Sequence, residues 1–267
     1  MRLVVKIGGS LLTDAAPDSL LADVAKLAPS NELVLVHGGG ELVTQIAQKM
    51  GKEQRFIVSP EGIRSRFTDR ETVDIYTMVM SGLISKRLTS ALAARGVKAV
   101  SLSGLDGSLM SGARKKRLVS MDERGRRVVV EGGYTGKVRG FNPDLIQRLH
   151  AGGYLPLISP VAIGEEGEPL NVDGDRAAAS AALATKADAV VFLTNVSGLL
   201  ADGQTVERLG IGEARSLLPS IGFGMQKKVM ASIECVEGGV PEAIICSGVG
   251  PTPISSGLSH VGCTVIS

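Results

Sequence analysis

The feature that most constrains the fold is a regular alternation of short apolar runs with segments of helical periodicity. Six runs are almost wholly apolar: 2–7 (RLVVKI), 32–36 (ELVLV), 97–102 (VKAVSL), 155–159 (LPLIS), 189–194 (AVVFLT) and 242–246 (EAIIC). Strands of this composition are covered on both faces, as in a parallel sheet with crossover helices on either side. The alternation therefore predicts an α/β fold with a doubly wound, mainly parallel sheet sandwiched by helices.

The segments between these runs carry helix signals. The first segment places four apolar residues on one helical face: Leu20, Leu21, Val24 and Leu27. A second helical face, within 42–50, is followed by Gly51, and glycine is favoured just past the end of a helix. Asn142 and Pro143 combine a capping side chain with a proline at the first helical position, so they predict the start of another helix.

Residues 114–140 interrupt this alternation. Within them, KRLVSM and RVVVE flank a glycine-containing turn, which predicts a β-hairpin over 114–131 attached to the sheet. The interruption also indicates two lobes, with a boundary near residue 170.

The same stretch is strongly basic. Residues 114–140 contain nine Lys or Arg and three Asp or Glu, although the whole chain has a formal net charge of only +2. A charge run is usually a solvated face, but an excess this large also suits an acidic macromolecular partner. Nucleic acid is the weaker alternative because aromatic residues for base stacking make up only 3% of the chain, with no Trp.

Two glycine loops follow the first two apolar runs: KIGGS (6–10) and HGGG (37–40). In an open α/β sheet such loops lie at the carboxyl ends of strands, where backbone N–H groups approach an anion. Two of them predict a polyphosphate ligand, although neither has the Walker or the dinucleotide spacing. HGGG also forms oxyanion holes in hydrolases, but the sequence lacks the nucleophile motif G-x-S-x-G.

Two further stretches carry charge where a helix begins. NVDGD (171–175) places Asn171, Asp173 and Asp175 before a small-residue helix, a pattern able to bind Mg²⁺, orient a lysine or cap the helix. GFGMQKKV (222–229) places Lys227 and Lys228 at the positive end of another helix, which is unfavourable unless an anion lies nearby. Such a local cost is typical of a functional site.

Cysteine, histidine and apolar length exclude several classes. Cys235, Cys246 and Cys263 are widely spaced in apolar runs, which indicates buried free thiols, and no His lies near them at zinc spacing. No apolar stretch approaches the roughly 20 residues of a membrane span. We expect a cytoplasmic protein, and no metal-ligating side chain is assigned.

Six motifs, in this order along the chain, resemble those of the amino acid kinase family: KIGGS, HGGG, RFTD (66–69), NVDGD, TNVSGLL (194–200) and GMQKKV (224–229). The resemblance covers essentially the whole chain and is close to the acetylglutamate kinase branch. Four stretches are most similar to the branch that phosphorylates 2-aminoadipate or glutamate bound to LysW, a small acidic amino-group carrier protein of lysine and arginine biosynthesis: SRFTDRET (65–72), SGLDG (103–107), RKKR (114–117) and GYTGKV (133–138).

This resemblance implies transfer of the γ-phosphoryl group of ATP to a side-chain carboxylate, giving an acyl phosphate, with Mg²⁺ held chiefly by the ATP phosphates and water. The implied catalytic residues are Lys6, Lys228 and Asp175, with the carboxylate orienting both lysines. Substrate binding is assigned to Gly38, Gly39, Arg66 and Asn171. ATP binding is assigned to Gly8, Gly9, Ser10, Asn195, Gly198, Leu199, Gly224 and Lys227.

The resemblance also implies how the chain is divided and what it meets. Residues 1–170 are expected to bind the amino acid and its carrier, and residues 171–267 to bind ATP, within one continuous kinase domain. A homodimer is expected through a long helix at about 70–94, with no nucleic-acid or membrane partner. Carrier docking is assigned to the basic hairpin, at Arg114, Lys115, Lys116, Arg117, Arg126 and Arg127.

Two alternatives stay open at this point. One is an N-acetylglutamate kinase that acts on the free substrate, and the other is a non-catalytic nucleotide or amino-acid sensor on the same fold. Aminoadipate and glutamate are also unresolved, because they differ by one methylene and a pocket discriminates that by only ~1–3 kcal/mol.

Overall fold

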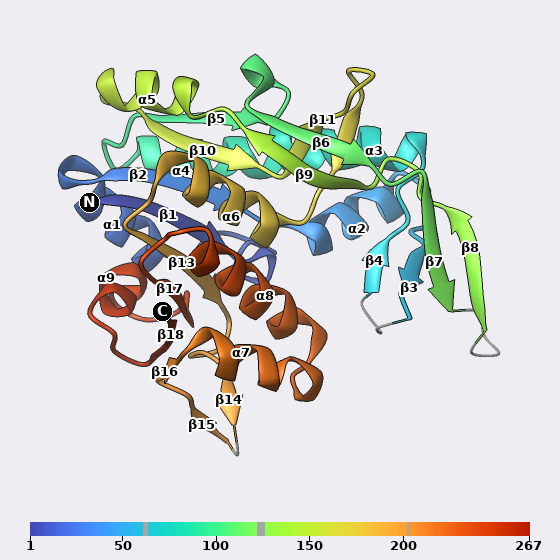
Figure 1. Ribbon diagram of the computed structural model, residues 1–267. Coiled ribbons are helices and arrows are strands. Elements are labelled where there is room, and N and C mark those ends of the chain that lie inside the picture. The colour runs from blue at the N-terminus through green and yellow to red at the C-terminus, as the bar shows by residue number, and fades with distance from the viewer. Residues whose placement is uncertain (61–63, 122–125, 202) are drawn as a thin grey trace.

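An eight-stranded sheet forms the centre of the computed structural model, which describes residues 1–60, 64–121, 126–201 and 203–267 (Figure 1). Its strand order is β16-β18-β17-β13-β1-β2-β10-β5, and every neighbouring pair is parallel except β17 with β18. The strands are β1 (Arg2–Ile7), β2 (Glu32–His37), β5 (Ala99–Ser103), β10 (Leu155–Ser159), β13 (Ala189–Thr194), β16 (Arg208–Leu209), β17 (Ala243–Ser247) and β18 (Cys263–Ile266). All six strands expected from the apolar runs lie in this sheet, so the fold prediction is confirmed.

Helices cover both faces of the sheet (Figure 1). They are α1 (Asp18–Leu27), α2 (Gly40–Lys49), α3 (Arg70–Thr77), α4 (Ser85–Ala93), α5 (Pro143–Ala151), α6 (Gly174–Thr185), α7 (Ile211–Leu217), α8 (Phe223–Glu237) and α9 (Pro253–Leu258). Successive residues of β1 point to opposite faces, as Leu3 and Val5 join a core with α1–α4 and α9, and Val4 joins one with α5–α8. This arrangement explains why the strands are apolar throughout.

Local signals also place the helix ends as expected. The Asn142 side chain accepts a hydrogen bond from Asp144 N at 3.0 Å and caps α5, with Pro143 at its first position. Gly51, just past α2, adopts a left-handed φ of +80°. Three short 3₁₀ turns, η1 (Gly9–Leu11), η2 (Ala28–Ser30) and η5 (Leu218–Ser220), begin or end these connections.

The long helix expected near 70–94 is continuous but not uniform. Between α3 and α4 lies a π-helical segment, η3 (Met78–Ile84). Val73, Tyr76 and Met80 are buried in the core of the same chain, whereas Met78 on the other side is 53% exposed. The apolar periodicity of the sequence predicts the helix but not the wider turns within it. Such π-helical segments often occur near functional sites.

Smaller sheets lie above and beside the central one. A four-stranded sheet has the order β12-β11-β6-β9, and contains β6 (Met110–Arg114), β9 (Gly136–Phe141), β11 (Val161–Ile163) and β12 (Pro169–Asn171). Three strand pairs complete the fold: β3 (Phe56–Val58) with β4 (Arg64–Arg66), β7 (Arg117–Met121) with β8 (Arg127–Glu131), and β14 (Leu200–Ala201) with β15 (Gln204–Thr205). A single-turn η4 (Asp106–Ser108) precedes β6.

The β7–β8 pair is the hairpin predicted from the basic stretch, and it projects from the body beside β3 and β4 (Figure 1). Its predicted turn, at 122–125, lies outside the described residues. The Ser120 hydroxyl on β7 donates to the Val58 carbonyl on β3 at 3.3 Å, so the two hairpins are in contact.

Candidate active site

The two glycine loops meet at the carboxyl ends of β1 and β2. The Gly38 N–H donates to the Ile7 carbonyl at 2.8 Å. A Cβ atom on Gly38 would lie 2.8 Å from Gly9 N, and one on Gly9 would lie 2.7 Å from Gly39 N, so a side chain at either position would collide with backbone. The loops lead into η1 and α2, so backbone N–H groups at two helix starts share one space.

Three charged residues from distant parts of the chain form a buried ion cluster beside these loops. Lys6 Nζ lies 2.8 Å from Asp175 Oδ1, and Lys228 Nζ lies 3.2 Å from Asp175 Oδ2. The side chains of Lys6, Asp175 and Lys228 are only 8%, 6% and 12% exposed. Strand β1 and helices α6 and α8 thus bring together the three residues that the sequence predicts as catalytic.

Burial and neighbouring charge act against each other in this cluster. Burial by itself raises the pKa of the Asp175 carboxyl, but Lys6 and Lys228 outweigh it and hold that pKa at about 2. Burial lowers the pKa of Lys228 and repulsion from Lys6 adds to this, whereas Asp175 opposes both. At neutral pH the Asp175 carboxylate is therefore ionised between the two lysine side chains.

At the start of α6, two different residues perform two of the roles that the sequence left open, helix capping and lysine orientation. Asp173 caps the helix, because its Oδ1 accepts from Asp175 N at 3.0 Å and Arg176 N at 3.2 Å, and its Oδ2 pairs with Lys227 at 3.3 Å. Asp175, two residues later, is left to contact the buried lysines. Gly174 lies next to Lys6, since a Cβ there would be in ordinary van der Waals contact with Lys6 Cε, at 3.4 Å.

Arg66 is buried and held at the start of α2. One of its guanidinium nitrogens, Nη2, donates to the Gly40 carbonyl at 2.6 Å and to Thr44 Oγ1 at 2.9 Å. The other, Nη1, donates to Gln54 Oε1, and the guanidinium lies 5.1 Å from the centre of the Phe56 ring. Arg66 thus lies next to the HGGG loop, and sequence reasoning missed the two side chains, Thr44 and Gln54, that orient it.

Asn171 and Arg66 are linked through the base of the hairpin. Asn171 Nδ2 donates to Thr68 Oγ1 at 2.9 Å, and that hydroxyl donates to the Arg66 carbonyl at 3.2 Å. Tyr134 N donates to the Thr68 carbonyl at 2.6 Å, and Asn171 N donates to the Tyr134 carbonyl at 2.9 Å. Gly133 has a left-handed φ of +58°, and a Cβ there would lie 2.1 Å from Thr68 O. The hairpin base and the two expected substrate anchors therefore form one hydrogen-bonded unit.

Most of the expected ATP-binding residues lie at the same edge of the sheet. The Gly8 N–H donates to a β13 carbonyl, that of Leu193, at 3.0 Å, and Ser10 is exposed on η1. Asn195 follows β13 directly and is exposed. Gly224 is exposed in the first turn of α8, and Lys227 lies one turn further on.

Two of the expected ATP-binding residues are packed into the protein instead. Leu199 is buried, and its N–H donates to Thr264 Oγ1 at 2.8 Å. Gly198 is buried against the same hydroxyl, which a Cβ would approach to 2.5 Å. The backbone of this TNVSGLL stretch is therefore fixed by β18, a strand that the sequence did not predict.

The expected docking residues of the hairpin divide into two groups. Arg114 donates through Nε to the Gly133 carbonyl at 2.6 Å and lies over the Tyr134 ring at 4.1 Å, so it stabilises the hairpin base. Lys116 pairs with Glu166 at 3.5 Å. Desolvation lowers the pKa of Lys115. Asp173 opposes this decrease, and nearby cations, Lys227 among them, add to it, so Lys115 lies within electrostatic reach of the catalytic end.

The outer strands carry the other group. Arg117 and Arg127 are exposed near opposite ends of the β7–β8 pair, and Arg126, next to Arg127, is also exposed. Val119 and Val129 are paired across the two strands and are 45% and 67% exposed. An apolar pair flanked by arginines is thus presented to solvent.

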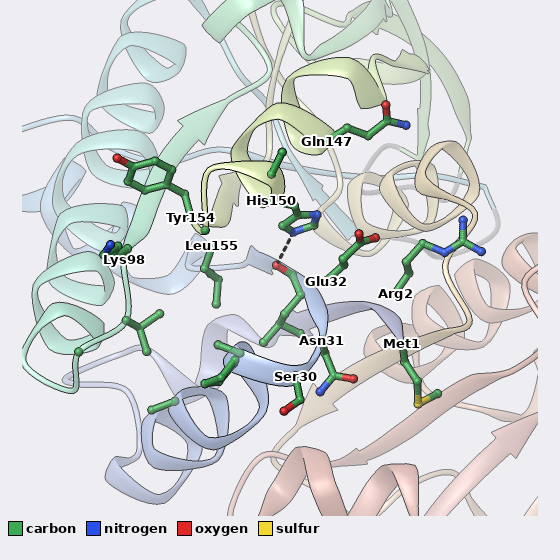
Figure 2. Close-up of a pocket in the computed structure, with 18 of the residues that line it drawn as sticks. Met1, Arg2, Ser30, Asn31, Glu32, Lys98, Gln147, His150, Tyr154 and Leu155 are labelled. Carbon is green, nitrogen blue, oxygen red and sulfur yellow. Dashed lines mark hydrogen bonds between the residues drawn. The ribbon is translucent and has the colours of Figure 1, made fainter.

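A large cavity of about 1120 Å³ lies at the opposite, amino edge of the sheet (Figure 2). Its lining includes Arg2, Lys98 and Tyr154, and His150, whose Nε2 donates to the Leu33 carbonyl at 3.1 Å. It contains none of the residues assigned to the site, so volume alone does not locate the chemistry in this fold, where ligands bind at the carboxyl ends of strands.

The hydrogen-bond donors and cations at the carboxyl edge of the sheet fit a nucleoside triphosphate. Two glycine loops whose Cβ positions are occupied by backbone, together with Lys6, Lys227 and Lys228, offer N–H groups and cations to phosphate oxygens. Within the described ranges, no group of three or more His, Cys, Asp or Glu is placed to hold a metal ion, and no helix is long and apolar enough to cross a membrane.

Residues 1–247 match the family model of the amino acid kinase family. The chain belongs to this family and is therefore a phosphotransferase. It is 48% identical over 264 residues to the putative LysW-aminoadipate/LysW-glutamate kinase of Nitrosopumilus maritimus, with 99% of this chain and 98% of that protein covered. It is 42% identical over 265 residues to the LysW-aminoadipate/LysW-glutamate kinase of Saccharolobus islandicus, with 99% of each covered.

Solved structures show the same fold at lower identity. N-acetylglutamate synthase from Neisseria gonorrhoeae, complexed with coenzyme A and N-acetyl-glutamate, matches with a TM-score of 0.81 and 23% identity, over 100% of this chain and 59% of that one. Carbamate kinase from Giardia lamblia, bound to AMP-PNP, matches with a TM-score of 0.69 and 16% identity, over 100% of this chain and 98% of that one. At identities this low, the similarity shows only that the fold is shared.

Proposed function

We propose that this kinase transfers the γ-phosphoryl group of ATP to the side-chain carboxylate of carrier-linked 2-aminoadipate, carrier-linked glutamate or both. The observation that carries the proposal is the buried Lys6–Asp175–Lys228 cluster beside two glycine loops. It is supported by relatives, 42% and 48% identical over nearly the full length, whose names specify LysW-linked aminoadipate and glutamate. The reaction belongs to lysine or arginine biosynthesis.

The catalytic roles follow from where charge develops. In phosphoryl transfer the negative charge spreads over the equatorial oxygens, and catalysis consists mainly of positioning and charge neutralisation. Lys6 and Lys228 stabilise this charge from two sides, and Asp175 holds both ammonium groups in place. Bound ATP supplies the phosphoryl group together with Mg²⁺, which its phosphates and water coordinate, while the N–H groups of the glycine loops hold phosphate and acceptor oxygens.

The substrate is anchored by Arg66 and Asn171. Arg66 is fixed beside the HGGG loop, so its guanidinium is pre-organised to pair with the free α-carboxylate of the amino acid. Asn171 Nδ2 is committed to Thr68, which leaves Oδ1 to accept the N–H of the amide that joins the amino acid to its carrier. An acceptor carboxylate between the two glycine loops then points toward the lysine cluster.

The acidic carrier docks on the β7–β8 hairpin. Arg117, Arg126 and Arg127 steer an acidic partner, and the exposed Val119–Val129 pair offers the apolar contact that such a surface requires. Arg114, Lys115 and Lys116 act nearer the body, where they connect the hairpin to its base, to the catalytic end and to Glu166.

The lobes, assembly and location follow from the same proposal. Residues 1–170 bind the amino acid and carrier, and residues 171–267 bind ATP. The chain forms a homodimer through the continuous helix 70–93, whose outer side exposes Met78, and equilibrium sedimentation tests this directly. A cytoplasmic location is supported by three buried cysteines that are all free.

The deciding experiment measures ATP turnover with three substrates in parallel: carrier-linked aminoadipate, carrier-linked glutamate and free N-acetylglutamate. We expect kcat/KM for at least one carrier-linked substrate to exceed that for the free compound by at least about 100-fold, since both docking and steering are lost without the carrier. A preference for free N-acetylglutamate would establish the N-acetylglutamate kinase alternative. ATP binding without turnover of any of the three would leave the sensor alternative.

A further inference from the structure

His37 opens the HGGG loop, and it is completely buried between that loop and the long helix. Its exposed fraction is 0%, and its Nδ1 lies 2.9 Å from the Gly38 carbonyl oxygen. Its Nε2 lies 2.8 Å from Oγ of Ser85, which is also fully buried. Ser85 begins α4 directly after the π-helical segment η3, whose Ile84 side chain lies against Gly39.

These contacts fix the tautomer of the imidazole. A backbone carbonyl only accepts hydrogen bonds, so Nδ1 carries the proton and donates it to Gly38. In the neutral ring Nε2 is then an acceptor, and the Ser85 hydroxyl donates to it. Burial lowers the pKa of His37 to about 4, an effect that the Gly38 hydrogen bond opposes and Lys6 reinforces, so the ring is neutral at physiological pH.

The tautomer in turn determines where the next peptide points. The Gly38–Gly39 peptide bond is trans, so its C=O and N–H point in opposite directions. With the carbonyl held by His37, the Gly39 N–H points away from the ring, on the side where Gly9 approaches. Gly39 is buried, and its N–H has no acceptor within the described part of the chain, which is uncommon for a buried donor.

We infer that His37 is a positioning residue, whose Nδ1–H tautomer, set by the Gly38 carbonyl and supported by the Ser85 hydroxyl, aims the Gly39 N–H at an oxygen of the phosphoryl donor or acceptor. The π-helical segment serves this arrangement, because it places Ser85 under the imidazole and Ile84 against the loop. The inference rests on the proposed kinase reaction for its kinetic consequence, but the tautomer itself does not depend on that reaction.

The first test observes the tautomer directly in the wild-type protein. The chain has only three histidines, so ¹⁵N-histidine labelling and two-bond proton–nitrogen correlation spectra resolve each ring. We expect one ring with a pyrrole-like Nδ1 and a pyridine-like Nε2, assigned to His37 by its loss in His37→Asn. A dominant Nε2–H tautomer at His37 would overturn the inference. This readout is independent of whether any substrate is turned over, so it separates a failure here from a failure of the proposed function.

The second test uses a pair of replacements that differ in where an amide nitrogen is placed. His37→Asn keeps a donor at the position of Nδ1, whereas His37→Gln places it at the position of Nε2. We expect His37→Asn to retain kcat within about threefold, and His37→Gln to lose about 10- to 100-fold in kcat with a smaller change in KM, as for a supporting hydrogen bond behind an oxyanion donor. Equal kcat values in the two variants would refute the positioning role.

Ser85→Ala provides a third variant that leaves His37 in place. The Nδ1–H tautomer should persist, because the Gly38 carbonyl still requires it, but loss of the donor to Nε2 should loosen the ring and lower kcat by about three- to tenfold. Ser232→Ala is the matched control, because Ser232 is equally buried but its hydroxyl has no hydrogen-bond partner among the described residues. A kcat in Ser85→Ala equal to that of the wild type would contradict the claim that Ser85 helps to hold the His37 ring in place.

Discussion

Asp175→Asn is the replacement with the most distinctive expected outcome. Among the described residues, Asp175 is the only carboxylate that contacts both Lys6 and Lys228, at 2.8 and 3.2 Å, so the replacement leaves two buried lysine side chains without their counter-charge. Breaking a buried ion pair in this way costs about 3–5 kcal/mol. At neutral pH the free energy of unfolding should fall by this amount and the Tm by about 10 °C, while kcat should fall by about 100-fold or more.

The pH dependence of this variant gives two opposite trends. Burial and Lys6 already lower the pKa of Lys228, and Asp175 is the main group that raises it, with a smaller contribution from Asp173. In Asp175→Asn that pKa therefore falls further below its unfolded value, and between the two values the unfolded chain binds more protons. Stability should therefore rise as pH approaches the ordinary lysine pKa of about 10.4 from below. Over the same range kcat should fall, because the neutral amine no longer stabilises the transferring group.

The assay combines denaturant unfolding with steady-state turnover across that pH range. Asp188→Asn is the matched control, because Asp188 pairs with Arg2 in an exposed contact of 3.7 Å whose loss should cost less than about 1 kcal/mol. In the wild type, the contribution of Asp175 is present above its unfolded pKa and is lost as pH falls through about 2. An Asp175→Asn protein with wild-type stability and parallel pH trends would refute the account of the cluster.

Three further predictions concern the lysines, the substrate anchor and the hairpin. Lys6→Met or Lys228→Met should lower kcat by about 100-fold or more with the fold retained by circular dichroism, and near-normal kcat would remove that lysine from the mechanism. Arg66→Lys keeps the charge but loses the fork that bonds Gly40 and Thr44, so KM for the amino-acid substrate should rise about tenfold while KM for ATP stays constant; an equal rise for ATP would assign the residue to phosphate. Arg117→Glu with Arg127→Glu should lower the association rate of the carrier in a manner that fades as salt increases, and an unchanged rate at low salt would leave the hairpin a solvated face.

The sequence was informative about the fold because its strongest signals are local. Strands β1, β2, β10 and β13 are covered on both faces and therefore apolar at nearly every position. Strand β18, with the sequence CTVI, is short and contains a threonine, so it lacked that signal. The π-helical segment shares the apolar periodicity of an ordinary helix, and its Met80 and Ile84 side chains lie against Gly39 of the HGGG loop.

The candidate site could be predicted where a residue is energetically unfavourable in its local sequence context. Lys6 lies at the end of an apolar strand and Lys228 at a helix start, and neither position stabilises a positive charge locally. In the structure both lysines form ion pairs with Asp175. Gln54 carries no such mark, because its role depends on Arg66 approaching it in space. The second hydrogen bond of the His37 ring likewise depends on Ser85, which is 48 residues away in the sequence.

The position of β1 within the sheet has a consequence for biosynthesis of the protein. Strand β1 is synthesised before the other strands of this sheet, yet its two neighbours are β2, which follows soon after, and β13, which ends at Thr194. Until β13 has been synthesised, one edge of β1 has no partner, and an unpaired apolar edge favours association with other chains. Lys228 is made later still, so a nascent chain cannot become active before it has committed its first strand to a distant partner. Between the synthesis of β1 and that of β13, the chain depends on chaperones or on fast elongation to avoid association.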